Sequence, residues 1–139
     1  MSTSEEEPVV QLSAEECWEL LESEEFGRLA YRLVDEVHLV PVNYVADAGV
    51  LLFRTTSGNK LLAAALHSDV AFGIDWHDEH AAWSVVVRGR LRRLHEDEVH
   101  RVEGRLLEPW VPLPRYEVVE LTPVSVSGRR FLLRRSGPA

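Results

Sequence analysis

Apolar and polar residues alternate along much of the chain, a pattern that indicates β-strands with one buried face. The alternation is clearest in residues 26–34, 70–76 and 83–93. In the first of these segments Leu29 and Tyr31 fall on one side, while Arg28 and Arg32 fall on the other. These three segments are therefore predicted to be strands of a sheet whose one face is buried.

Two further apolar runs, residues 37–46 and 50–53, stand on either side of Asp47-Ala48-Gly49. A short turn of this composition between two apolar runs predicts a β-hairpin. The first run is apolar on both faces, which suits a central place in the sheet. Pro41 lies inside it, however, and proline cannot donate to the ladder, so the sheet is expected to be edged, bulged or open there.

Helix signals stand between the predicted strands. Ser13 and Glu16 form a capping box, in which each side chain bonds the backbone of the other residue. Cys17 and Leu21 then fall on one face of the helix that this box begins. Three short helices are predicted, over residues 14–23, 58–67 and 95–107.

Two last strands, residues 116–126 and 129–133, are expected to be joined at Ser127-Gly128. The total is about seven strands, and closing them into a barrel would remove the exposed sheet edges. We therefore predict an α+β fold, mainly β, with a six- to seven-stranded antiparallel β-barrel and short flanking helices. Residues 11–135 are expected to form one domain, after a mobile acidic segment over residues 1–10 and before a tail over residues 136–139.

Charge and cysteine content narrow the class of partner. The chain carries 15 Lys and Arg against 23 Asp and Glu, a formal net charge of -8. This excess of acid argues against binding to nucleic acid or to an anionic membrane surface. The single cysteine, Cys17, leaves no intrachain disulfide, and no apolar run approaches the roughly 20 residues of a membrane span. A cytoplasmic protein is expected.

The segment Arg54-Thr55-Thr56-Ser57-Gly58-Asn59-Lys60 links a predicted strand to a predicted helix. It offers two cations and three hydroxyls at a helix start, where backbone N–H groups are free and a phosphate is favoured. The sequence therefore predicts an anion site here. The alternative interpretation is a polar turn capped by Ser57.

Two other charged segments are candidates for ligand binding. The turn at residues 77–80 contains two histidines and two acids, but zinc needs converging ligands that the chain does not offer elsewhere, so no metal site is predicted. The basic stretch at residues 88–93 could line a partner groove, bind a phosphorylated substrate or form salt bridges with the acidic N-terminal region. The salt bridges are the favoured interpretation.

Several motifs in a fixed order resemble the pyridoxamine 5′-phosphate oxidase-like family of flavin-binding split barrels. The motifs are FGRLAY at 26–31, HLVPVNY at 38–44, LLFRTTSGNK at 51–60, WSVVVRGRLRRL at 83–94, EPW at 108–110 and LTPVSVSGRRF at 121–131. The resemblance covers roughly residues 11–133. It implies a split β-barrel that forms a homodimer, with FMN bound in a groove between the two subunits.

By motif position, the resemblance implies that residues 41–44 lie along the flavin ring and residues 53–56 along the ring edge and ribityl chain. Ser57 and Lys60 would reach the phosphate, and Trp110 of the partner subunit would close the site. The implied cofactor contacts are thus Pro41, Val42, Asn43, Tyr44, Phe53, Arg54, Thr55, Thr56, Ser57, Lys60 and Trp110. The chain lacks the terminal Arg, Trp and His segment of the true oxidases, which argues against vitamin B6 as its substrate.

The implied function is an FMN-dependent oxidoreductase that reduces a small planar acceptor with a hydride from reduced nicotinamide or deazaflavin. No side chain is assigned as catalytic, because the groove would align the two rings and the cofactor would carry the chemistry. Deazaflavin or FAD is the alternative cofactor. The alternative functions are a non-catalytic protein that binds or stores flavin or deazaflavin, and a structural domain with an empty groove.

Overall fold

The computed structural model describes residues 7–106 and 115–134. Strands dominate it, with three short α-helices and one 3-10 turn between them. In chain order the elements are β1 (Val9–Gln11), α1 (Ala14–Ser23), β2 (Phe26–Leu33), β3 (Glu36–Asn43), β4 (Val45–Asp47), β5 (Val50–Thr56), α2 (Lys60–Ala65), β6 (Asp69–His77), β7 (Ala81–Arg93), α3 (Glu96–Val102), the 3-10 turn Glu103–Arg105, and β8 (Tyr116–Leu132).

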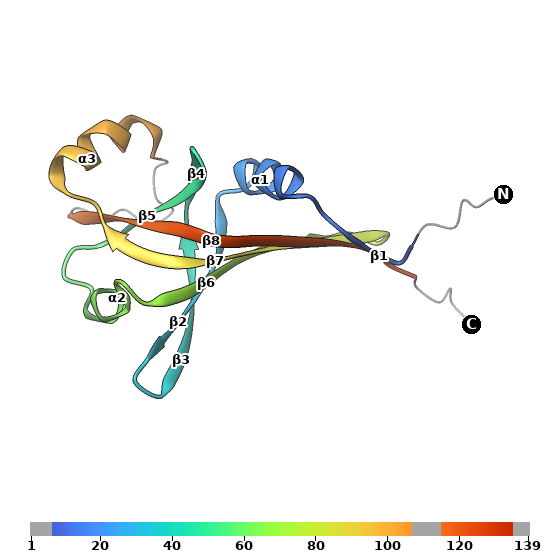
Figure 1. Cartoon of the computed structure of the whole chain (residues 1–139), viewed down its shortest axis with the longest axis horizontal. Helices are drawn as coiled ribbons and strands as arrows, with labels where there is room; N and C mark the ends of the chain where they lie inside the picture. Colours follow the sequence, from blue (N-terminus) through green and yellow to red (C-terminus); the bar gives the residue numbers. More distant parts are fainter. Residues whose placement is uncertain (1–6, 107–114, 135–139) are drawn as a thin grey trace.

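All the strands of the described residues belong to one antiparallel sheet with the order β3-β2-β6-β7-β8-β5-β4, and β1 pairs with β8. The two end strands, β3 and β4, follow each other in the chain and are joined through Tyr44 alone. Cα atoms of β3 and β5 approach within 8 Å of each other, so the two ends of the sheet come together (Figure 1). The predicted mainly β fold with an antiparallel barrel and short helices is confirmed.

The prediction of one central strand over residues 37–46 is wrong. The run is divided at Tyr44 into β3 and β4, which lie at opposite ends of the sheet. The backbone N–H of Tyr44 donates to the carbonyl of Glu25 (3.0 Å) instead of continuing a ladder. An edge position also suits Pro41, which has no N–H to give.

The larger of two hydrophobic clusters among the described residues fills the interior of the barrel. Phe72 of β6 is central to it, because the rings of Tyr44 and Phe53 both pack on it, with centroid distances of 4.8 and 5.6 Å. The other large, fully buried side chains of this core are Leu21, Leu29, Leu51, Leu91, Leu121, Val85, Val87 and Val119.

Helix α1 begins as predicted, with the Ser13 hydroxyl accepting from the Glu16 N–H (3.1 Å) and Glu16 accepting from the Ser13 N–H (2.9 Å). Its buried side chains, Cys17 and Leu21, face the sheet. The helix lies so close to β8 that a Cβ at Gly128 would stand 2.7 Å from the Cys17 sulfur.

That close approach explains why the predicted turn at Ser127-Gly128 is wrong. Both residues are paired with β7 inside one continuous strand, β8, opposite Val86 and Val85. The glycine therefore makes room for a helix rather than reversing the chain. At the other edge of β8, Val9 and Val10 of the N-terminal segment form β1 opposite Phe131 and Arg130.

The helices differ from the sequence expectation mainly in length. The helix predicted over residues 58–67 is α2, only six residues long, and the one predicted over 95–107 is α3 followed by a 3-10 turn. Within residues 7–106 and 115–134, none of the helices is long and apolar enough to cross a bilayer.

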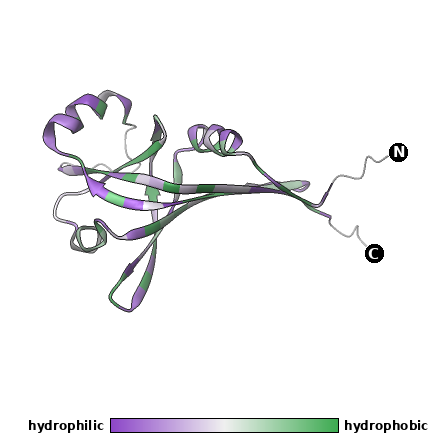
Figure 2. Cartoon of the chain, viewed as in Figure 1, coloured by the Kyte–Doolittle hydropathy of each residue, from purple (hydrophilic) through white to green (hydrophobic). Residues whose placement is uncertain are grey.

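The β2–β3 hairpin projects from the body of the sheet and carries apolar stretches, whereas α3 is largely polar (Figures 1 and 2). The turn of this hairpin consists of Val34 and Asp35, which lie between the paired residues Leu33 and Glu36. Val34 is 90% exposed and has a φ of 55°, a left-handed conformation that a β-branched residue adopts only with strain.

We expect Val34→Asn to raise the free energy of unfolding by about 1 kcal/mol, because asparagine tolerates the left-handed conformation and the valine buries little. Urea denaturation measures the change. Val37→Asn is the matched control, since Val37 is also exposed (66%) but lies in a regular strand, and it should give no gain. Equal effects of the two substitutions would show that the turn stores no strain.

Candidate functional site

The predicted anion-binding segment forms a structured turn between β5 and α2. The Asn59 N–H donates to the carbonyl of Thr56 (3.1 Å), and the Ser57 N–H donates to the carbonyl of Arg115 (3.3 Å). The Asn59 amide also donates to the Thr55 hydroxyl (3.3 Å). These bonds fix the backbone of the turn and orient one of its three hydroxyls.

The outer side of this turn is open. Gly58 has a φ of 81°, which glycine adopts without strain, and a Cβ there would have no neighbour within 4 Å. Thr56 and Ser57 are exposed and Thr55 is half-buried. Hydroxyl donors therefore stand at an accessible surface, where a ligand could approach the backbone closely.

Arg54 adds a cation to the end of β5, just before these hydroxyl-bearing residues. It points to the face of β5 opposite Phe53 and is half-buried, with its guanidinium carbon 4.8 Å from the centroid of the Tyr116 ring. The Tyr116 hydroxyl in turn bonds a carboxylate oxygen of Glu103 (3.1 Å). Stacking on an aromatic ring holds the charge in one place, which suits recognition of an anion.

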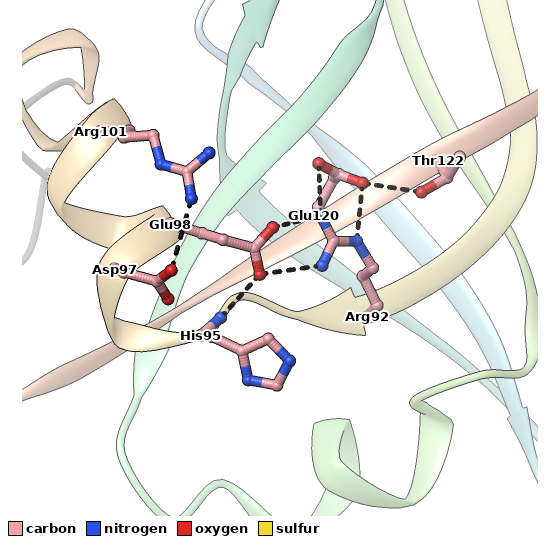
Figure 3. A network of polar contacts seen from close by, with 7 residues as sticks. All are labelled: Arg92, His95, Asp97, Glu98, Arg101, Glu120 and Thr122. Carbon is pink, nitrogen blue, oxygen red and sulfur yellow. Dashed lines mark hydrogen bonds and ion pairs between the residues drawn. The ribbon is translucent and has the colours of Figure 1, made fainter.

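Helix α3 packs Val99 and Val102 against a small apolar cluster of the sheet, and a network of charged groups adds to this contact (Figure 3). The Arg92 guanidinium donates to both carboxylate oxygens of Glu98 (3.1 and 2.7 Å) and to Glu120 (3.1 Å). The Thr122 hydroxyl donates to Glu120 (2.8 Å), and the His95 N–H donates to Glu98 (3.0 Å). Because the bonds are charge-assisted and bidentate, they are stronger than a single surface ion pair.

The basic stretch at residues 88–93 does form salt bridges, but the prediction that the acidic N-terminal region supplies the partners is wrong. Three of its four arginines pair, within the described residues, with acids that the sheet register or α3 brings beside them. The pairs are Arg90 with Asp69 (3.2 Å), Arg92 with Glu98 and Glu120, and Arg93 with Glu117 (3.5 Å).

The network around Glu98 predicts how the stability of the fold depends on pH. Hydrogen bonds from Arg92, and then from the His95 N–H, lower the pKa of Glu98 from its usual 4.5 to about 2. A depressed pKa stabilises the fold fully above 4.5, and the contribution is lost as pH falls from 4.5 to about 2. We therefore expect Glu98→Gln to destabilise the protein most above pH 4.5 and least near pH 2, as measured by thermal denaturation followed by circular dichroism. A difference from wild type that is constant across this range would contradict the assignment.

The residues predicted to lie along the flavin ring divide between the outer face and the core. Pro41 is exposed on the outer face of β3, while Val42 packs against the core. The Asn43 amide donates to the carbonyl of Glu25 (3.2 Å). The outer face of β3 thus keeps Pro41 accessible, and Asn43 ties the strand end to the segment before β2.

Tyr44 and Phe53 have their side chains inside the barrel. The Tyr44 hydroxyl donates to the carbonyl of Leu21 (2.6 Å), and burial raises the pKa of this hydroxyl well above its usual value. The two rings are therefore positioned as core residues that shape the strands on which the proposed contacts lie. Side-chain direction, which depends on which face of the barrel is filled, was not part of the motif-based prediction.

The remaining predicted contacts are less fully described. Lys60 is the first residue of α2, but its side chain lies outside the described part of the structure, as does the whole of Trp110. Because α2 is short, the donors of the turn itself matter more than the helix dipole. Arg54, Thr55 and Thr56 are thus the last residues of β5, with alternate side chains on opposite faces of the strand, and Ser57 follows them in the turn. Residues of β5 approach β3, the strand that carries Pro41.

Sequence reasoning missed a cavity of about 520 Å³ on the outer face of the sheet. Five strands contribute to it, and small side chains form part of its wall. Its lining includes Ala30, Arg32, Val37, Ala71, Arg88 and Val124. One sequence signal for this cavity is the outward row Arg28, Ala30 and Arg32 of β2, in which a small residue lies between two cations. The strand register that completes the cavity cannot be seen in the sequence.

Comparison with known proteins gives consistent matches. The family described as pyridoxamine 5′-phosphate oxidase matches residues 13–130. An uncharacterized protein of Mycobacterium tuberculosis is 31% identical over 131 residues, which cover 89% of this chain and 86% of that protein.

Two solved structures are also similar. One is a candidate pyridoxamine 5′-phosphate oxidase from Corynebacterium glutamicum, with 33% identity and a TM-score of 0.83 over 95% of this chain and 100% of the other. The second is a FAD-binding protein from Mycobacterium smegmatis, with 35% identity and a TM-score of 0.77 over 88% of this chain and 98% of the other.

Proposed function

Because this chain belongs to the pyridoxamine 5′-phosphate oxidase family, we propose that it binds a flavin between β3 and the turn after β5, and that it reduces a small planar acceptor. The observation that carries the proposal is the donor set of that turn. Arg54, with its guanidinium over the Tyr116 ring, precedes Thr55, Thr56 and Ser57 at the end of β5, and an open glycine follows them.

This donor set fits a flavin phosphate. A phosphate accepts several hydrogen bonds at once and prefers guanidinium and hydroxyl donors, together with backbone N–H groups. The isoalloxazine ring needs a flat apolar surface, which the exposed Pro41 and its neighbours on β3 supply. A bound flavin supplies the electron-transfer chemistry, and the chain's own residues bind, orient and shield it from water.

FMN is the simplest ligand for a site with one phosphate anchor. The Mycobacterium smegmatis relative is named for binding FAD, which supports FAD as the alternative, and deazaflavin remains a third choice. All three share a planar ring system and a phosphate-bearing tail. The turn after β5 is proposed to hold the first phosphate in each case.

We also propose that the protein is a homodimer, with the flavin site completed by the partner subunit. The support is an apolar row on the outer face of β3, where Val37 and Leu39 are 66% and 65% exposed beside Pro41. An exposed apolar row on an edge strand favours association. Trp110 of the partner subunit is proposed to close the site. Light scattering that gives a monomer mass at micromolar concentration would contradict this part of the proposal.

A non-catalytic flavin carrier is the second candidate function. It is favoured by the chemistry of the described contacts, which bind but do not transfer protons. Tyr44, the one weak acid among them, is buried, and its hydroxyl already donates to Leu21. Anaerobic addition of reduced nicotinamide or reduced deazaflavin separates the two functions, since only the oxidoreductase should bleach its flavin.

Lys60 provides a direct test of the phosphate site, because it is the second cation of the segment at residues 54–60. It is also the only lysine in the chain. We expect Lys60→Ala to weaken FMN binding by about tenfold or more through loss of a charge-assisted contact, and Lys60→Arg to weaken it much less. Quenching of FMN fluorescence on titration measures both. Arg101→Ala is the control for a lost positive charge, because Arg101 pairs with Asp97 on the exposed face of α3. Equal binding by both Lys60 variants would remove Lys60 from the site.

A further inference from the structure

The outer-face cavity is built on one row of residues that crosses five strands. The register places Leu39 of β3 beside Ala30 of β2, which is beside Ala71 of β6, then Arg88 of β7 and Ser125 of β8. The two alanines in the middle leave the space of about 520 Å³, a volume within the range of small-molecule sites. The cavity therefore has a shallow apolar floor with the guanidinium of Arg88 at one side.

Two arginines of the lining stand out by their lack of partners. Among the described residues, the side chains of Arg32 and Arg88 make no hydrogen bond or ion pair, whereas the next arginine in the same row of β7, Arg90, is paired with Asp69 at 3.2 Å. In a chain with eight more acids than bases, two guanidinium groups left unpaired beside a cavity are complementary to an anion. Guanidinium groups match phosphate geometry in particular.

Apolar side chains lie on the rim of the same cavity. Val124, 79% exposed, is displaced outward where the β7–β8 register shifts between Arg88 and Gly89. Val37, 66% exposed, faces the cavity from β3. Valine side chains and the flat faces of guanidinium groups offer surfaces against which a planar ring can pack.

The cavity lies within reach of the proposed flavin site along two paths. Val37 is on the same face of β3 as Pro41, four residues or about 13 Å away. Asp69, another lining residue, begins β6 and is separated from the turn that is proposed to hold the first phosphate by α2, about 9 Å long, and by residues 66–68. A ligand larger than FMN could therefore occupy both places.

We propose that the cavity binds the adenosine diphosphate portion of a dinucleotide, with the phosphates between Arg32 and Arg88 and the adenine against the valine rim. The inference rests on the proposed flavin function. Two sources share this chemistry: FAD itself, and a nicotinamide dinucleotide that delivers a hydride to the flavin.

The test is a set of binding titrations on the full-length protein. FMN and FAD are followed by fluorescence quenching, and NADPH and ADP by calorimetry. The variants are Arg88→Ala, Arg32→Ala and Ala71→Leu, which fills the floor, with Arg101→Ala as the charge control and circular dichroism to check folding. If FAD is the source, wild type binds FAD about tenfold tighter than FMN, and each cavity variant loses that advantage while its FMN affinity stays unchanged.

If the nicotinamide dinucleotide is the source, FMN and FAD bind alike, and the cavity variants weaken NADPH and ADP binding about tenfold. The proposal is overturned if wild type shows neither a preference for FAD nor binding of ADP and NADPH, or if the cavity variants bind all these ligands as wild type does. If the cavity proposal is overturned but FMN still binds, the proposed flavin site is unaffected. If the protein bound ADP but neither FMN nor FAD, the proposed flavin site would be contradicted and the cavity proposal would not.

Discussion

Tyr44→Ala is expected to lower the free energy of unfolding by about 3–5 kcal/mol, because it removes a buried aromatic ring and leaves a cavity in the core. The side chain is 2% exposed, and its ring packs edge-on against Phe72 with a centroid distance of 4.8 Å. Its hydroxyl donates to the carbonyl of Leu21 at 2.6 Å. Because Tyr44 alone joins β3 to β4, the cavity left by alanine would loosen the point where the two ends of the sheet meet. Urea denaturation measures the loss.

Tyr44→Phe is the control that separates packing from hydrogen bonding. It keeps the ring and removes only the bond to Leu21, so we expect a loss of about 1–3 kcal/mol. We also expect Tyr44→Ala to weaken flavin binding, because β3 and β5 carry the two halves of the proposed site. A Tyr44→Ala protein as stable as wild type would show that the closure does not depend on this side chain.

Gly89→Ala is expected to cost about 3 kcal/mol, through overlap with the neighbouring strand. A Cβ at Gly89 would collide with the carbonyl oxygen of Thr122 and would stand 2.8 Å from a methyl group of Leu121. The backbone cannot move away easily, because β7 is paired on both sides, with β6 and with β8. The register shift of β7 against β8 lies at this residue, so the strain would spread into the longest strand pairing of the sheet.

Gly104→Ala is the matched control for the same added methyl group. A Cβ at Gly104 meets nothing within 4 Å, so we expect a change within about 0.5 kcal/mol. Denaturant midpoints of the two variants, compared with wild type, measure the difference. If the two glycine substitutions had similar effects, the close contact at Gly89 would not be a determinant of the fold.

Local signals in the sequence predicted the elements that depend on local chemistry. The capping box of Ser13 and Glu16 fixed the start of α1, and the β4–β5 hairpin followed from its turn, where Ala48 and Gly49 both have left-handed φ values. Both features involve residues within three or four positions of one another. The residues that make these bonds are close together in the sequence, which is why the pattern alone was sufficient to predict them.

Features that depend on distant partners were not predictable in the same way. The run of residues 37–46 was divided by a bond from Tyr44 to Glu25, and Gly128 was kept small by Cys17 of a helix far away in sequence. In the site, the turn from Arg54 to Ser57 was identified from its donors. The cavity beside Arg88 was not, because only the register of five strands places Ala30 and Ala71 in one row with Arg88.

The central claim, that this barrel binds a flavin, is tested most directly by an absorbance spectrum. The purified protein is incubated with FMN or FAD, freed of excess ligand by gel filtration and scanned, and the molecule released on denaturation is identified by mass spectrometry. The account predicts that the protein retains flavin absorbance at close to one flavin per chain. A colourless protein that retains neither flavin would contradict it.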